Sequence, residues 1–212
     1  MIKPKKRRAS GAGKTLFVAL MLIASALAQS RIEPGTPVSA YSPTFDVAGG
    51  YSYLSSSIPS AGRVNLYGFN ASAHADFLPH WGVALDFGYV RASNVLGTGH
   101  PGYTLTLLGG PVFYPLTHGI TRPFLHALAG AGLVDGTLPL NSTSNLQAWV
   151  ERPAFALGGG VERSVVGPFG VRVTGDYLRT AYADATATVR LQNDLRVTGS
   201  LVFQLNYHGN RE

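Results

Sequence analysis

The stretch Trp81–Val90, WGVALDFGYV, decides the fold of this 212-residue chain. Large apolar residues occupy every second position in it, at Trp81, Val83, Leu85, Phe87 and Tyr89. Most of the positions between them are small or polar, and Asp86 is charged. Because successive side chains of a strand point to opposite faces, this period of two predicts a β-strand with one apolar and one small or polar face.

The same alternation recurs along the rest of the chain. Further strands are predicted at 45–53, 67–77, 102–114, 122–134, 150–162, 168–179 and 194–207. No segment shows the spacing of three and four residues that marks an amphipathic helix. The sequence therefore predicts an all-β fold of eight strands.

Alternation alone fits both a soluble β-sandwich and a membrane barrel, so strand length and spacing must separate them. Most of the predicted strands have about ten to fourteen residues, which suits a tilted membrane strand better than a globular one. Long connections, at 55–62, 92–101, 135–149 and 180–193, alternate with short ones, at 78–80, 115–121 and 163–167. This rhythm is typical of outer-membrane barrels and predicts four surface loops.

Aromatic residues gather toward the predicted strand ends, as in the two interfacial girdles of membrane barrels. They are Phe45, Tyr53, Tyr67, Phe77, Trp81, Tyr89, Tyr103, Phe113, Phe169, Tyr177 and Tyr207. An even number of strands also allows the last strand to pair with the first, which leaves no open edge in hydrocarbon. We therefore predict an eight-stranded antiparallel up-and-down transmembrane β-barrel with a periplasmic N-terminus.

The first 28 residues are typical of a secretory signal peptide. Six basic residues precede or flank the apolar run Thr15–Ala28, which closes on the small-residue pattern Ala26-Leu27-Ala28. The run is too short to span a bilayer as a helix, so cleavage after Ala28 is favoured over an uncleaved anchor. The predicted organisation is a signal peptide at 1–28, an N-terminal lead at 29–43, the barrel at 44–207 and a C-terminal tail at 208–212.

Removal of the signal peptide changes the charge of the chain. Six of the 17 basic residues lie in it, which leaves 11 arginines against 11 acidic residues. The formal charge of +6 is therefore no sign of nucleic-acid binding, and no nucleic-acid partner is expected. The chain has no cysteine, which excludes disulfides and thiolate metal sites.

Four segments resemble the outer membrane protein β-barrel domain family, which is related to the OmpA-type barrel: Pro123–Ala127, Ala154–Gly160, Gly175–Thr180 and Asn193–Val197. The resemblance covers essentially residues 44–207. The last predicted strand is also similar to the C-terminal assembly signal of outer-membrane proteins, through Leu201, Phe203, Leu205 and Tyr207. The resemblance implies a place in the bacterial outer membrane, contact with its lipid, and recognition by the barrel assembly machinery.

The alternation directs eight ionisable residues into the barrel: Asp46, His74, Asp76, Asp86, Glu162, Arg172, Asp176 and Arg196. The interior of an eight-stranded barrel is just wide enough for side chains to fill, so these charges must pair or hold water. A salt-bridged plug is the main expectation, with a narrow water path or a specific ion or ligand site as alternatives. The pair most suggestive of a ligand is His74 with Asp76, and the triple glycine 158–160 is expected to serve close strand packing.

No catalytic, cofactor-binding or metal-binding residue is predicted, and the features together favour a non-enzymatic structural or interaction barrel of the outer membrane. Its loops are the expected site for an extracellular ligand. A narrow pore for ions or small solutes is the first alternative. A periplasmic lipocalin-like carrier, with the apolar strand faces lining a cavity, is the second, although the strand length, loop rhythm and terminal aromatic weigh against it.

Overall fold

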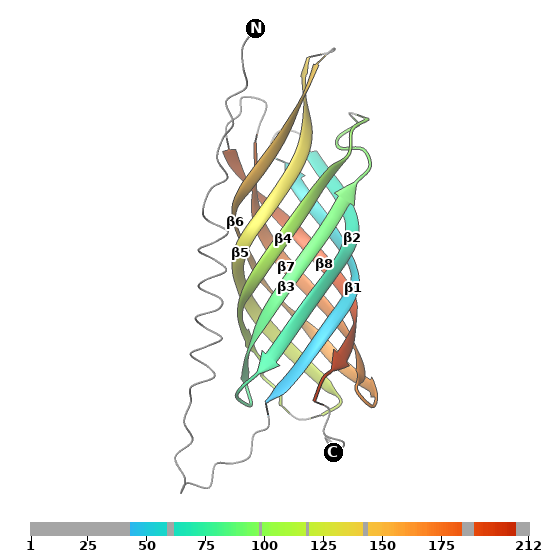
Figure 1. Ribbon diagram of the computed structural model, residues 1–212, viewed down its shortest axis with the longest axis vertical. Coiled ribbons are helices and arrows are strands. Elements are labelled where there is room, and N and C mark those ends of the chain that lie inside the picture. Colours follow the sequence, from blue (N-terminus) through green and yellow to red (C-terminus); the bar gives the residue numbers. More distant parts are fainter. Residues whose placement is uncertain are drawn as a thin grey trace, which may run out of the picture. The chain divides into compact units, whose positions relative to one another are not determined.

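The computed structural model describes residues 43–58, 62–97, 99–117, 119–141, 144–183 and 189–206. They form eight strands, β1 (Thr44–Ile58), β2 (Gly62–Asp76), β3 (Trp81–Ala92), β4 (Gly102–Phe113), β5 (Thr121–Asn141), β6 (Ser144–Val166), β7 (Phe169–Ala183) and β8 (Val189–Gln204). Each strand pairs with the next, and β8 pairs with β1 to close an antiparallel barrel (Figure 1). The predicted fold class is therefore confirmed.

Several predicted features lie outside the described residues. They are the signal peptide at 1–28, nearly all of the lead at 29–43, Tyr207 of the assembly signal, and the tail at 208–212. Within the described ranges, no helix is long and apolar enough to cross a membrane.

The seam between β1 and β8 closes the barrel with a continuous register from Asp46 opposite Gln204 to Ser57 opposite Asn193. The pairing continues just past β8, where the Leu205 amide donates to the Phe45 carbonyl at 2.8 Å. The start of β1 and the end of β8 consequently lie at one end of the barrel, which we call the terminal end. The opposite end, where β1 runs into β2, is called the loop end.

The outer surface of the barrel is apolar on every strand. Its exposed side chains include Val47, Phe69, Leu85, Leu107, Leu125, Leu157, Val173 and Leu201, the last of which is 72% exposed. Soluble monomers do not leave such a continuous apolar surface in water, whereas a barrel in lipid requires it. The arrangement is also the reverse of what a lipocalin-like carrier needs, because that carrier would turn its apolar faces inward.

The two ends of the outer surface carry different aromatic residues. At the terminal end, phenylalanine and tryptophan pack in pairs, as Trp81 does with Phe113 and Phe169 with Phe203, with ring centroids 4.9 and 5.3 Å apart. At the loop end the residues are tyrosines, and Tyr53 lies 5.3 Å from Tyr67. Tyrosine and tryptophan prefer the boundary between lipid and water, so both ends fit an interfacial position.

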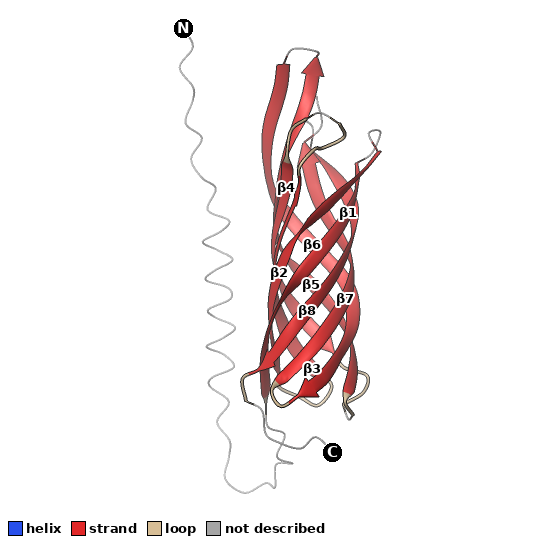
Figure 2. Cartoon of the chain, turned by 90° about the vertical axis from the view of Figure 1, so that its right-hand side faces the viewer, coloured by secondary structure: helices blue, strands red, loops and turns tan. Residues whose placement is uncertain are grey.

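Three of the four predicted long connections are wrong in extent. The strands continue through most of 55–62, 135–149 and 180–193, and β5 and β6 form a hairpin that projects beyond the neighbouring strands at the loop end (Figures 1 and 2). The alternation of polarity stops near the loop end, but the backbone pairing continues. Sequence polarity therefore marked the edge of the apolar band instead of the ends of the strands. At the other end of the chain, β8 stops at Gln204, three residues before the predicted end at 207.

Candidate functional site in the barrel interior

The structure buries all eight of the ionisable residues that the alternation directs inward. Asp46, His74, Asp76, Asp86, Glu162, Arg172, Asp176 and Arg196 are each at most 7% exposed. Six of the eight strands contribute to this set: β1, β2, β3, β6, β7 and β8. Their charges form groups around three arginines.

Arg172 holds the first group together. Its guanidinium donates to Glu162 on the neighbouring strand β6 at 2.5 Å and to Asp46 on β1 at 2.8 Å. A weaker bond at 3.4 Å reaches the Ser72 hydroxyl on β2. Because β8 lies between β7 and β1 in the sheet, the bond to Asp46 ties strands that are not direct neighbours.

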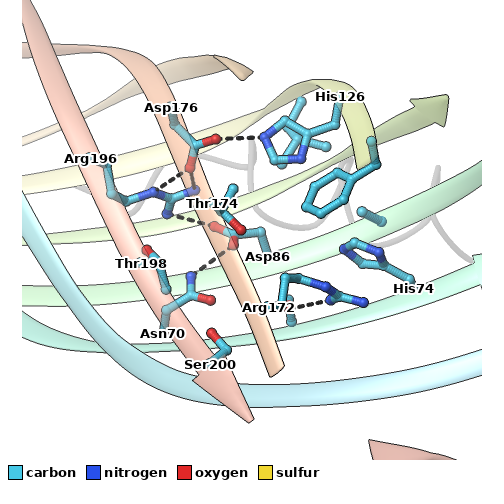
Figure 3. Close-up of a pocket in the computed structure, with 14 residues that line it drawn as sticks. Asn70, His74, Asp86, His126, Arg172, Thr174, Asp176, Arg196, Thr198 and Ser200 are labelled. Carbon is cyan, nitrogen blue, oxygen red and sulfur yellow. Dashed lines mark hydrogen bonds and ion pairs between the residues drawn. The ribbon is translucent and has the colours of Figure 1, made fainter. Parts of the chain in front are cut away.

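Arg196 holds the second group, shown in Figure 3. It donates to Asp86 on β3 and to Asp176 on β7, both at 2.7 Å. Asn70 donates to the other oxygen of Asp86 at 2.7 Å, and Nε2 of His126 lies 2.6 Å from Asp176. The bridge from β8 to β3 therefore crosses the interior of the barrel.

Arg122 holds the third group, at the terminal end. It donates to Asp76 at 2.8 Å, and its guanidinium carbon lies 4.1 Å from the centroid of the Tyr114 ring. The Thr44 hydroxyl also donates to Asp76, at 2.9 Å. The Tyr114 hydroxyl in turn lies 3.2 Å from Nδ1 of His74.

The predicted set of interior charges did not include Arg122, His126 and Tyr114, although His126 was expected to be a packed interior residue. All three stand at the alternate positions that face inward in the predicted strands. The alternation that identified the other eight residues could therefore also have found them. The suggestive pair His74 and Asp76 bind different partners, since His74 contacts Tyr114 while Asp76 contacts Arg122 and Thr44. The two side chains do not share a common ligand position in the described contacts.

The pairing leaves none of these five interior carboxylates without a cation. Asp46, Asp76, Asp86, Glu162 and Asp176 each lie within 2.8 Å of a guanidinium nitrogen, because Arg172 and Arg196 serve two acids each. A buried carboxylate is tolerated only when it is paired and hydrogen-bonded. The network is therefore a packing of the interior in which three guanidiniums are shared among five carboxylates.

A small cavity lies between the Arg172 and Arg196 groups. Its lining includes Ser72, His74, Phe124, His126 and Thr174, together with the two arginines (Figure 3). Its volume is about 10 Å³, which is roughly the room that one water molecule needs. Nδ1 of His126 has no hydrogen-bond partner among the described residues. A cavity of this volume is too small for a solute larger than water.

Toward the loop end aliphatic side chains join the polar ones in the interior, which the sequence pattern did not predict. Buried aliphatic side chains come from four strands: Leu54, Val64, Leu66, Val90 and Leu178, each at most 6% exposed. We call these five residues the apolar plug. Asp194 is also buried near this end, and it accepts hydrogen bonds from Thr180 at 2.9 Å and Gln192 at 3.2 Å. Leu178 lies opposite Asp194 in the register of β7 and β8, so apolar and polar side chains pack together in this part of the interior.

The triple glycine allows close approach of the strands, as the sequence reasoning expected. A Cβ at Gly158 would lie 2.3 Å from an Asp176 carboxylate oxygen, and one at Gly160 would lie 2.1 Å from the Val173 carbonyl. Any side chain at these positions would occupy space that the neighbouring strand already fills. The glycines therefore set the spacing that brings Asp176 into the network.

The interior shows part of a familiar catalytic arrangement, the hydrogen bond between His126 and Asp176. Nucleophilic catalysis also needs a hydroxyl or thiol within reach of the second imidazole nitrogen. No such group bonds to Nδ1 of His126 within the described part of the chain. In the same part, no three histidine, aspartate or glutamate side chains form a cluster that could hold a metal ion.

Comparison with protein-family models and with curated proteins gave no match. Solved structures do match. Neisserial surface protein A superimposes with a TM-score of 0.60 and 13% identity over 76% of this chain and 98% of its own. This is the fold of the eight-stranded outer-membrane barrels. Ail, the attachment invasion locus protein of Yersinia pestis, superimposes with a TM-score of 0.55 and 16% identity, again over 76% of this chain and 98% of its own.

The outer-membrane barrel fold accounts for nearly the whole length of both solved proteins. At 13 and 16% identity the likeness concerns the fold alone. What distinguishes this barrel must therefore come from its own side chains, above all the charged network, the apolar plug and the surfaces at its two ends.

Proposed function

We propose that this chain is a non-enzymatic β-barrel of the bacterial outer membrane, a rigid and filled scaffold that presents interaction surfaces outside the cell. One observation carries the proposal: the closed barrel is apolar outside and is filled by paired charges and an apolar plug inside. Such a structure is stable in lipid, and its paired and packed interior disfavours the passage of solutes. Its variable parts are then the loop end and the outer surface.

The proposed orientation places the terminal end in the periplasm. Export through the predicted signal peptide delivers the chain there, with cleavage near Ala28. The outward-facing residues Leu201, Phe203 and Leu205 are exposed, in the manner of a strand that the barrel assembly machinery recognises before insertion. The loop end then faces the exterior, where the projecting hairpin of β5 and β6 and the four connections are available to an extracellular ligand.

The orientation can be tested by cysteine labelling, because the chain has no cysteine of its own. Glu151→Cys places a thiol on β6 at the loop end, and Val166→Cys places one at the terminal end, at a position that is 69% exposed. A membrane-impermeant maleimide is expected to label the first variant in intact cells and the second only after permeabilisation of the outer membrane. The reverse pattern, or soluble protein in the periplasm, would overturn the proposal.

A narrow pore is the alternative that this filled interior opposes. The purified barrel, reconstituted in planar bilayers, is expected to give no discrete conductance steps in concentrated KCl, because the interior cavity has room for about one water. A general porin in the same bilayer serves as the positive control. Reproducible steps from the folded barrel would contradict the sealed interior and favour the pore.

A further inference from the structure

The lipid-facing sides of β2 and β3 end at the loop end in a common order. Along β2 the outward residues run Phe69, Tyr67, Asn65 and Arg63, and along β3 they run Phe87, Tyr89 and Arg91. Each strand therefore passes from a hydrocarbon ring to a phenol and then to a guanidinium. Such an order follows the change from acyl chains to polar headgroups across a membrane interface.

These residues lie next to one another on one sector of the barrel. Arg91 is opposite Tyr67 in the register with β2 and opposite Tyr103 in the register with β4. The Tyr53 hydroxyl on β1 donates to the Asn65 side chain at 2.9 Å. We call the set the tyrosine–arginine patch, and its members are Tyr53, Arg63, Asn65, Tyr67, Arg91 and Tyr103.

The two arginines of the patch differ from those inside the barrel. Arg122, Arg172 and Arg196 each bind carboxylates, whereas Arg63 and Arg91 are exposed and no hydrogen bond or ion pair holds them within the described residues. A guanidinium at a membrane interface favours a phosphate, which it binds through two parallel hydrogen bonds. The patch therefore supplies two uncompensated cations at the depth where headgroups lie.

The terminal end carries no comparable arrangement in its described residues. Its outward aromatic residues there are Phe45, Phe77, Trp81, Phe113, Phe169 and Phe203, none of which has a hydroxyl. On the side of β5, Asp135 lies opposite Tyr103 at the edge of the patch and is buried, and Glu151 follows on β6. The outward arginines Arg163 and Arg179 have no tyrosine opposite them in the register, so the pairing of arginine with tyrosine distinguishes the patch.

We propose that the tyrosine–arginine patch binds the phosphorylated sugar headgroup of a glycolipid in the outer leaflet. Arg63 and Arg91 bind its phosphates, Asn65 and the tyrosine hydroxyls bind its sugar hydroxyls, and the acyl chains lie over Phe69 and Phe87. This inference rests on the proposed outer-membrane orientation, which puts the patch in the outer leaflet. Charge complementarity selects phosphate, and the exposed tyrosines with Asn65 select a sugar over a bare phospholipid headgroup.

The test uses the refolded barrel in detergent, with purified lipid A, a diphosphorylated glucosamine disaccharide lipid, as the probe. Native mass spectrometry measures its binding to wild type, to Arg63→Gln/Arg91→Gln and to the control Arg163→Gln. Arg163 is an exposed, outward arginine near the terminal end of β6. We expect the double variant to bind about tenfold more weakly and the control to bind like wild type.

Three results would overturn the inference. The double variant could bind lipid A as tightly as wild type, dephosphorylated lipid A could bind as tightly as the intact probe, or phosphatidylglycerol could bind equally well. The last result would indicate simple attraction to anionic lipid. Each preparation is first checked for the heat-dependent gel shift of a folded barrel in SDS. Failure of wild type to show that shift would overturn the proposed function, whereas a folded wild-type barrel that binds no lipid A would overturn this inference alone.

Discussion

Replacement of Arg196 by Met is expected to destabilise the barrel by about 3–5 kcal/mol. Methionine fills much of the same space but leaves Asp86 and Asp176 in the interior without their shared guanidinium. Two buried carboxylates then lose their cation at once, because Asp176 keeps only His126 and Asp86 keeps only the neutral amide of Asn70. Urea unfolding in lipid vesicles, followed by tryptophan fluorescence, measures the change in the free energy of unfolding.

Two further variants show whether the unpaired charge is the cause. Arg179→Met changes an exposed arginine on the outward face of β7 and is expected to alter the free energy of unfolding by less than about 0.5 kcal/mol. Arg196→Met/Asp86→Asn/Asp176→Asn removes both orphaned charges and is expected to recover most of the loss. If Arg196→Met alone were as stable as wild type, water would have to reach the interior freely, and the filled network would be contradicted.

Replacement of Gly160 by Val is expected to cost about 4 kcal/mol or more, or to prevent folding. The new Cβ would lie 2.1 Å from the Val173 carbonyl oxygen on β7 and 2.9 Å from the Phe124 ring on β5. The first of these atoms belongs to the backbone of the neighbouring strand, so no side-chain rotation relieves the overlap. β6 and β7 would have to separate where Glu162 and Arg172 meet.

Gly175→Val is the matched control, because Gly175 on β7 pairs with Gly159 on β6 and a Cβ there meets nothing within 4 Å. Valine adds apolar surface toward lipid and favours extended backbone, so stability is expected to stay equal or rise. The same unfolding measurement compares the two variants. Equal losses at both positions would show that any side chain in these strands is harmful and would remove the role of strand spacing at Gly160.

The fold could be predicted from the sequence because alternation with a period of two shows directly which residues face the inside of a barrel and which face the outside. Asp86 and Leu85 are neighbours in the chain, yet one is buried in the network and the other lies on the lipid-facing surface. The alternation of odd and even positions along a strand is enough to assign each residue to the inside or the outside of the barrel. It does not show where strands end, because polarity ceases to alternate at Ser55, Ser56 and Ser57 of β1 while the backbone stays paired with β2 and β8.

The composition of the interior could be predicted, but its pairing could not. The odd or even position of a residue predicts which face of the strand it lies on. It does not predict the position of the residue along the barrel axis, which depends on strand tilt and stagger. Asp46 meets Arg172 across an intervening strand, and Arg196 on β8 meets Asp86 on β3. The apolar plug was not predicted for the same reason. Leu54 and Val90 face inward like the charged residues of the same strands, and only their position along the barrel axis separates them from those charges.

The seam between β1 and β8 also governs how the barrel folds. It joins the two ends of the described barrel sequence, so its closure carries the largest loop entropy of any pairing in the molecule. Until the seam forms, β1 cannot bring Asp46 to Arg172. Closure of the last edge and the pairing of Asp46 with Arg172 therefore belong to one late step, and a chain that lacked β8 would also lose both ion pairs of Arg196.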